Sequence, residues 1–306
     1  MEKGKQYIPV FTSTSMEIRP ECVPCLMERV RFQAILAGNG TEFKALKEAL
    51  STYAEEFAEG RNSAEVATAV HRSAYAAMGI PDPYLELKVR ADDVAMEYLD
   101  RAEEMVNSSK DRLRTAVLLS VIGNIMDFGS GIAIDDPDDF RNEFEKLLSQ
   151  GIGSDDTDKM EAILKNAKKV IFIFDNCGEG QLDKILIKEL QSYGVKVIGV
   201  VRGEPILNDV TKEDAERIGL DKVLDGLYTT GQFAIGVDMK GIGEDLRKEI
   251  ESADLIIAKG MANYESLSDQ PMKIPVVHIL RTKCKPVADS LGIPTGINVV
   301  RFISGK

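Results

Sequence analysis

The sequence has no tryptophan, only two histidines and only four cysteines among 306 residues. The two histidines, His71 and His278, exclude a three-histidine zinc site and an HExxH protease. Four cysteines without regular spacing are far fewer than a disulfide scaffold needs, which favours a reducing cytoplasm. Any bound metal ion must therefore use carboxylates, amides or the cysteines.

Long apolar runs and positive charge are also scarce. No apolar run approaches the roughly 20 residues that cross a bilayer, so we expect no membrane span. Lysine and arginine number 38 against 50 aspartates and glutamates, which gives a net charge of −12. Because an acidic surface repels phosphate backbones and anionic membranes, we expect neither nucleic acid nor membrane as a partner. A small anion can still bind where a metal ion or a few local cations reverse the field.

The length predicts two domains, because one domain usually takes about 100–200 residues. Helical periodicity covers residues 42–150, and helices are expected at 43–57, 64–78, 85–106 and 112–125. From about residue 155 short β-branched runs alternate with amphipathic segments, which is typical of βαβ units and a mostly parallel sheet. These runs lie at 170–174, 195–201, 255–258, 276–280 and 299–303. We place the boundary between the two parts within 110–155.

Polar residues directly after the strand runs are informative, because ligands bind beyond the carboxyl ends of parallel strands. Asp175, Asn176 and Asp209 supply two carboxylates and an amide oxygen, a hard-oxygen set that suits Mg²⁺ or Mn²⁺. Lys259 and Arg202 lie at the same edge and are candidates to hold a phosphoryl group. The alternative is that these acidic and amide residues only cap helices and the cations are solvated.

Two polar residues, Asn124 and Asp127, end the apolar helix expected at 112–125. Because buried polar groups need partners, Asn124 is a candidate to reach into the cleft, toward substrate or a metal-bound water. The spacing equally allows Asn124 to cap the helix beside Gly123.

Cys22-Val23-Pro24-Cys25 is a CxxC motif, which fits half a zinc site, a redox pair or two packed thiols. A four-cysteine zinc site would have to recruit Cys177 and Cys284, which we do not expect because both follow strands of the sheet part. Cys22 and Cys25 are therefore candidates for a second metal site or a redox pair.

In these clusters and in their order, the sequence resembles the damage-control phosphatase family. This family was formerly known as a domain of unknown function, and its eukaryotic relatives include acidic-residue methyltransferase-like proteins. The resemblance rests on Cys22-x-x-Cys25, Gly123-Asn124-x-x-Asp127, Asp175-Asn176-Cys177-Gly178-Glu179, Arg202-Gly203-x-Pro205-Ile206-x-Asn208-Asp209-x-Thr211 and Lys259-Gly260-x-x-Asn263-Tyr264-Glu265. The CxxC motif and Cys177 look like the stand-alone prokaryotic subfamily. This implies an all-helical N-terminal domain packed on a three-layer α/β/α sandwich with a mostly parallel sheet. We expect the helical domain to cover residues 1–130 and the sandwich to cover residues 131–306.

The resemblance also implies a divalent-metal-dependent phosphatase of small phosphorylated metabolites, such as sugar phosphates or related damaged compounds. Its metal ligands fall on Asp175, Asn176 and Asp209, and the expected ion is Mn²⁺, Mg²⁺, Co²⁺ or Ni²⁺. Its phosphate-contacting residues fall on Lys259 and Gly260, with Asn263 as a substrate contact. Eukaryotic relatives have an arginine where this chain has Glu265, so that contact is not transferred.

We therefore hypothesise hydrolysis of a phosphate monoester by a metal-activated water that attacks in line. Lys259, with Arg202, would neutralise the phosphoryl oxygens, and Glu179 is the candidate general base or water orienter, with Asp175 beside it. Two rival functions remain. An S-adenosylmethionine-dependent carboxyl methyltransferase would bind that cofactor without a divalent ion, whereas a non-catalytic phosphometabolite-binding protein would bind the ester without releasing product.

Overall fold

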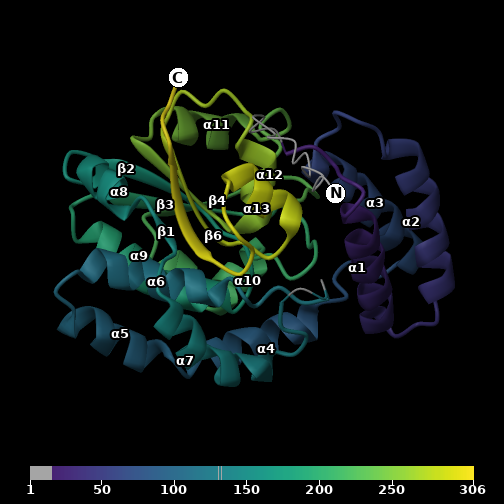
Figure 1. Cartoon of the computed structure of the whole chain (residues 1–306), viewed down its shortest axis with the longest axis horizontal. Coiled ribbons are helices and arrows are strands. Elements are labelled where there is room, and N and C mark those ends of the chain that lie inside the picture. Colours follow the sequence, from purple (N-terminus) through teal and green to yellow (C-terminus); the bar gives the residue numbers. More distant parts are fainter. Residues whose placement is uncertain (1–15, 130, 132) are drawn as a thin grey trace, which may run out of the picture.

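The computed structural model describes residues 16–129, 131 and 133–306. Helices alone make up its first part, and strands alternate with helices in its second (Figure 1). The helices of the first part are α1 (Cys22–Ala37), α2 (Glu42–Glu56), α3 (Ser63–Met78), α4 (Leu85–Met96), α5 (Leu99–Ser108), α6 (Arg112–Gly123) and α7 (Phe140–Gln150), which follows the short η1 (Pro137–Asp139). In Figure 1, α1, α2 and α3 lie together beside the sheet, and α4 to α7 lie below it.

The second part forms one sheet of seven strands in the order β1-β7-β6-β5-β2-β3-β4. The pair β6 and β7 is antiparallel, and every other neighbouring pair is parallel. The strands are β1 (Ser154–Asp155), β2 (Lys169–Ile173), β3 (Lys196–Val201), β4 (Gly226–Thr229), β5 (Leu255–Lys259), β6 (Val276–Arg281) and β7 (Asn298–Ile303). The helices between them are α8 (Thr157–Leu164), α9 (Glu179–Gln191), α10 (Lys212–Arg217), η2 (Leu220–Lys222), α11 (Glu244–Glu251), α12 (Gly260–Leu267) and α13 (Lys285–Leu291).

Both faces of the sheet are buried, which makes this part a three-layer sandwich. Along β2, Val170 and Phe172 pack into the large cluster that includes α6 and α9, whereas Ile171 and Ile173 pack with α11 on the other face. Successive side chains of a strand point to opposite faces, so a strand that is buried on both sides is apolar at every position. The predicted fold class is therefore confirmed.

Strand order also fixes where a ligand site can form. The chain passes from β2 through α9 to β3 on one side of β2, and from β5 through α12 to β6 on the other side. Between the carboxyl ends of β2 and β5 the connections diverge, and a crevice opens at such a switch point. The clusters after β2 and β5 therefore meet there.

Most expected elements match the structure, and the differences have local causes. The helix expected at 85–106 is broken between α4 and α5, where the ring of Tyr98 packs on Phe140 and Phe144. The sequence pattern predicts no element at α1, β4 or α12. The edge strand β4 is short and only half-buried, and α12 starts directly at the end of β5 without a loop. The expected end of α3 is confirmed, with Gly79 in the left-handed conformation at φ 70°.

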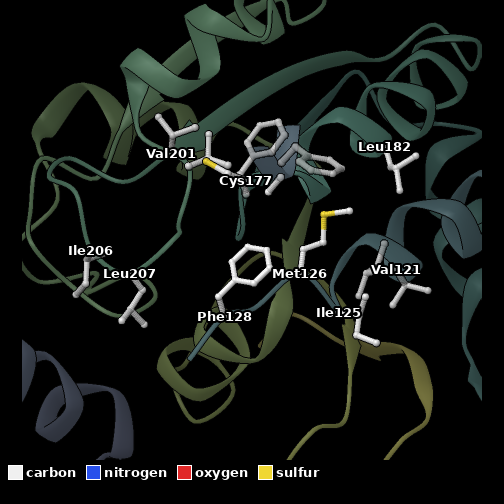
Figure 2. Close-up of a cluster of buried hydrophobic side chains, with 14 of the residues drawn as sticks. Val121, Ile125, Met126, Phe128, Cys177, Leu182, Val201, Ile206 and Leu207 are labelled. Carbon is white, nitrogen blue, oxygen red and sulfur yellow. The ribbon is translucent and has the colours of Figure 1, made fainter. Parts of the chain in front are cut away.

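No helix among the described residues is long and apolar enough to span a membrane. The division at 1–130 and 131–306 stays a prediction. The largest buried apolar cluster contains residues of both parts (Figure 2). In it, Met126 and Phe128 from the segment after α6 lie near Cys177 and Leu207 of the sheet part.

Candidate functional site

Backbone pairing brings Asp175, Asn176 and Asp209 together, although Asn176 and Asp209 are 33 positions apart in the sequence. Asn176 and Asp209 form an antiparallel bridge. On either side of it, the Val210 amide donates to the Asp175 carbonyl at 2.8 Å and the Cys177 amide donates to the Asn208 carbonyl at 2.8 Å. The segment after β2 is thus joined to the segment after β3, so three hard-oxygen side chains share one place.

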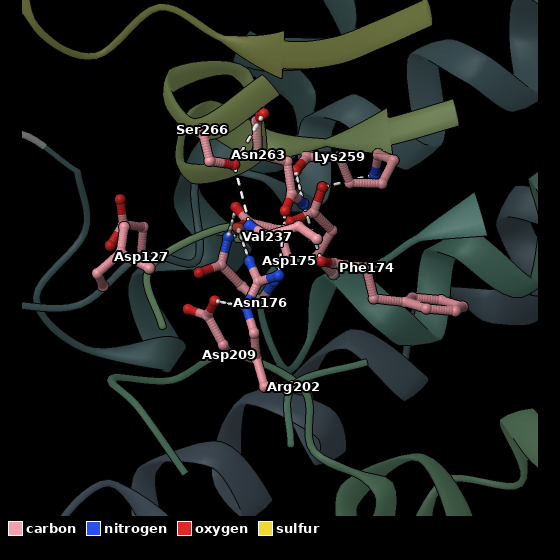
Figure 3. Close-up of polar contacts among 12 residues, drawn as sticks. Asp127, Phe174, Asp175, Asn176, Arg202, Asp209, Val237, Lys259, Asn263 and Ser266 are labelled. Carbon is pink, nitrogen blue, oxygen red and sulfur yellow. Dashed lines mark hydrogen bonds and ion pairs between the residues drawn. The ribbon is translucent and has the colours of Figure 1, made fainter. Parts of the chain in front are cut away.

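Arg202 connects the two carboxylates from the end of β3. Its Nε donates to Asp209 Oδ2 at 2.6 Å, and its Nη2 lies 3.6 Å from Asp175 Oδ1. Its Nη1 donates to Asn263 Oδ1 at 3.0 Å, and the Asn263 amide donates to the Phe174 carbonyl at 3.0 Å. Figure 3 shows this group, with Asp127 to one side of it. Arg202 and Asn263 are both buried and hold the carboxylates in place.

Behind the carboxylates lies a buried charged network centred on Lys259. Its Nζ donates to Glu179 Oε1 at 2.5 Å and to Asp183 Oδ1 at 2.6 Å, and none of the three side chains is exposed. Burial lowers the pKa of Lys259, but Asp183 and Glu179 outweigh it, so the pKa is raised and the amine stays charged. The other predicted phosphate ligand, Arg202, is likewise engaged by carboxylates, so direct contact of either cation with a phosphoryl group stays a prediction.

Asn124 joins the network to the carboxylates. Its side-chain nitrogen donates to Asp175 Oδ2 at 3.1 Å and to Glu179 Oε2 at 2.9 Å, and its oxygen accepts from the Arg281 amide at 3.1 Å. Asn124 is thus both the residue that follows α6 and a side chain of the site. A contact with substrate stays a prediction.

Gly260 supports Asp175 because it has no side chain. Its φ is +74°, and a Cβ atom there would lie 1.8 Å from Asp175 Oδ2. The Asp175 carboxylate therefore occupies the space that a side chain at position 260 would fill.

We expect Gly260→Ala to displace the Asp175 carboxylate and to destabilise the fold by about 1–3 kcal/mol through clash and backbone strain. Thermal unfolding and calorimetric titration with Mn²⁺ measure the two effects. Gly243→Ala is the matched control, because Gly243 has a negative φ and a Cβ atom added to it would meet no atom within 4 Å. Unchanged Mn²⁺ binding in Gly260→Ala would contradict this role for the glycine.

A cavity of about 120 Å³ opens onto these residues. Of the predicted site residues, Asp175, Asn176, Asp209, Cys22 and Cys25 line it. The others, namely Glu179, Lys259, Gly260, Asn263, Arg202 and Asn124, lie outside its lining. The structure thus separates the predicted site into a set that faces the cavity and a set that supports it from behind.

Five charged residues line the cavity without having been predicted as site residues, namely Glu21, Arg29, Asp127, Glu265 and Lys283. Of these, Arg29 lies on α1, Asp127 follows α6 and Lys283 follows β6. Lys283 stands in a polar cluster after a strand, which is a usable signal. Arg29 lies four residues, one helical turn, after Cys25, but this signal requires knowing that α1 is a helix.

Three of the four cysteines line the same cavity. Cys22 and Cys25 occupy the first turn of α1, and Cys284 comes directly before α13. Burial, reinforced by Glu265, raises the pKa of Cys22 to about 11 and that of Cys284 to about 12. Cys177 lies instead among apolar side chains (Figure 2). The role of Cys22 and Cys25, as a second metal site or a redox pair, stays a prediction.

The donor set fits a hard divalent cation. Burial and then the neighbouring carboxylates Asp209 and Glu179 raise the pKa of Asp175, and burial raises that of Asp209. A divalent cation would relieve this repulsion. Among the described residues no three His, Cys, Asp or Glu side chains form a metal-binding group, so the amide oxygen of Asn176 would have to act as the third protein ligand.

The orientation of Asn176 agrees with that requirement. Its side-chain nitrogen donates to Asp175 Oδ2 at 2.7 Å and to Glu179 Oε2 at 3.1 Å. Because ionised carboxylates only accept hydrogen bonds, the amide nitrogen has to face them. The amide oxygen is then the atom left for a cation.

Comparison with known proteins gives consistent matches over nearly the whole chain. The family model described as the damage-control phosphatase ARMT1-like domain matches residues 18–299. A damage-control phosphatase of Archaeoglobus fulgidus is 38% identical over 94% of this chain and 100% of its own length. A damage-control phosphatase of Pyrococcus horikoshii is 30% identical over 92% and 96% of the two chains. The crystal structure of a DUF89 family protein from Pyrococcus horikoshii superposes with a TM-score of 0.81 at 28% identity, covering 93% of this chain and 98% of that one.

Proposed function

The chain belongs to the damage-control phosphatase ARMT1-like family, and from this premise we propose that it hydrolyses phosphate monoesters of small metabolites with a divalent metal ion. The family supports a phosphatase that acts on damaged metabolites. The observation that best supports the metal dependence is the convergence of Asp175, Asn176 and Asp209 on the lining of one cavity. We propose these three as the protein ligands of Mn²⁺, Mg²⁺, Co²⁺ or Ni²⁺.

A divalent ion supplies Lewis acidity to a phosphoryl oxygen and lowers the pKa of water, both of which favour phosphate ester hydrolysis. The chain's own residues prepare the place. Arg202 sets the distance between the two carboxylates, and Asn124 and Asn176 turn their nitrogens toward Asp175 and Glu179. We propose that Glu179, held by Lys259, fixes the orientation of these amides. In this proposal Glu179 affects an attacking water indirectly, through the positions of Asn124 and Asn176.

The substrate we propose is a small phosphorylated metabolite, such as a sugar phosphate or a related damaged compound. The small volume of the cavity supports a small substrate. Asn263 stays a proposed substrate contact, and its side-chain oxygen accepts a hydrogen bond from Arg202. We also propose a cytoplasmic location, supported by four cysteines that are free thiols.

The test is phosphate release by protein stripped with EDTA. Sugar phosphates, nucleotides and a chromogenic aryl phosphate are each offered with Mg²⁺, Mn²⁺, Co²⁺ or Ni²⁺ singly. We expect release that depends on the added metal and that disappears in Asp209→Ala.

Two results would contradict the proposal. Equal release by the EDTA-stripped protein without added metal would remove the metal dependence. No release with any metal would remove the phosphatase, and calorimetry with S-adenosylmethionine and with the same esters would then separate the methyltransferase from the non-catalytic binding protein.

A further inference from the structure

Arg29, Asp127 and Lys283 form a compact ion cluster on the cavity wall. Arg29 approaches Asp127 with both terminal nitrogens, Nη1 at 2.8 Å from Oδ1 and Nη2 at 2.9 Å from Oδ2. Lys283 Nζ donates to the same Oδ2 at 2.8 Å. The side chains of Arg29, Asp127 and Lys283 are 11%, 10% and 3% exposed, respectively. Three segments far apart in the chain thus meet in one nearly dehydrated cluster.

The charges of this cluster do not cancel, because two cations face one carboxylate. Burial alone would raise the pKa of Asp127, but Arg29 and Lys283 hold it well below its usual range. The carboxylate is therefore ionised and the cluster carries a net positive charge. The cavity lining also carries the carboxylates of Glu21, Glu265, Asp175 and Asp209, so Arg29 and Lys283 are local cations of the kind that an anion needs in an acidic cavity.

The cluster lies beside the proposed metal ligands. Arg29, Asp127 and Lys283 line the same cavity as Asp175 and Asp209. Burial raises the pKa of both Asp175 and Asp209; the charge of Lys283 offsets part of this rise at Asp175, and the charge of Asp127 adds to it at Asp209. Among the described residues of the cavity lining, Arg29 and Lys283 are the ones with a lysine or arginine side chain. Lys259 and Arg202 are buried behind it and are engaged by carboxylates.

The geometry of the cluster matches a phosphoryl group. A guanidinium fork binds carboxylates and phosphates with the same two parallel hydrogen bonds, and a lysine adds a point charge to either. We propose that Arg29 and Lys283 form the anion clamp that receives the phosphoryl group of the substrate, and that the Asp127 carboxylate occupies this clamp when substrate is absent. This inference rests on the proposed function and assigns phosphate binding to a pair of residues outside the predicted site.

The clamp predicts effects of opposite sign for its members. Arg29→Gln and Lys283→Gln each remove a charged hydrogen-bond donor, so each should weaken inorganic phosphate binding and raise KM about tenfold to a hundredfold with a smaller change in kcat. Asp127→Asn removes the internal competitor and should tighten inorganic phosphate binding. A merely structural role for Asp127 would not produce tighter binding.

Isothermal titration with inorganic phosphate, with and without Mn²⁺, measures these effects on the full chain. Arg31→Gln and Lys285→Gln are the matched controls, because both are exposed cations two residues from a clamp residue, and both should bind phosphate like wild type. If circular dichroism shows that Arg29→Gln does not fold, the same titrations are made with Arg29→Lys and Lys283→Gln.

The outcomes separate this inference from the proposed function. A wild type that releases phosphate from esters while Arg29→Gln and Lys283→Gln keep wild-type phosphate affinity and KM overturns the clamp alone. Unchanged or weaker phosphate binding in folded Asp127→Asn also overturns it. A wild type that binds inorganic phosphate through Arg29 and Lys283 but hydrolyses no ester supports the clamp and contradicts the proposed phosphatase.

Discussion

Asp175→Asn is expected to lower metal-dependent phosphate release by at least about a thousandfold, because it removes several kcal/mol of transition-state stabilisation by the metal ion. The substitution keeps the shape of the side chain but removes its charge. It also puts an amide nitrogen among groups arranged for a carboxylate, because Asp175 Oδ2 accepts hydrogen bonds from both Asn124 and Asn176. Affinity for Mn²⁺ should fall together with the rate.

The measurement is the initial rate at saturating Mn²⁺ together with a calorimetric Mn²⁺ titration. Asp93→Asn is the matched control, since Asp93 is exposed on α4 and lies outside the cavity lining, and it should behave like wild type. An Asp175→Asn protein with near-normal turnover would show that the metal site lies elsewhere.

Lys259→Met is expected to destabilise the protein by about 3–5 kcal/mol, because removing one partner of a buried ion pair leaves uncompensated buried charge. Here two carboxylates, Glu179 and Asp183, lose the same partner. Burial raises the pKa of Asp183 to about 7 even with Lys259 present. Asp183 is therefore mostly protonated at pH 6 and mostly charged at pH 8, so the loss of stability should be larger at pH 8.

Urea unfolding at the two pH values measures this loss. Lys188→Met is the matched control, because Lys188 forms an exposed ion pair with Glu103 and such pairs contribute about 0–1 kcal/mol. Adding Asp183→Asn to Lys259→Met should recover part of the stability. If Lys259 acts only as a phosphate ligand, Lys259→Met will instead unfold like wild type and raise KM.

The sequence indicated much of the fold because its patterns are local. Runs rich in β-branched residues such as Val195–Val201 are typical of strands buried on both faces, and the structure has β3 there. The elements without such a pattern were missed. The strand β4 is an edge strand, and α12 depends on a turn at Gly260 that no periodicity reveals.

The carboxylate cluster was also accessible from sequence, because the carboxyl ends of parallel strands meet at one edge of a sheet. That rule places Asp175, Asn176 and Asp209 at the same edge without any knowledge of their contacts. It places Lys259 and Arg202 there as well, but it does not say which way a long side chain turns. Their nitrogens lie within 2.6 Å of buried carboxylates. For Lys259 this arrangement depends on how α9, which carries Glu179 and Asp183, packs against the sheet.

The sequence by itself determined the parallel sheet, the helical first part and the set of oxygen donors, because periodicity and strand ends are properties of neighbouring residues. Tertiary structure alone decided which cations face the cavity. Arg29, Asp127 and Lys283 come from α1, the segment after α6 and the segment after β6. Nearly 100 residues lie between Arg29 and Asp127, and over 150 between Asp127 and Lys283. Their meeting follows from the packing of the helices on the sheet, and no local pattern encodes that packing.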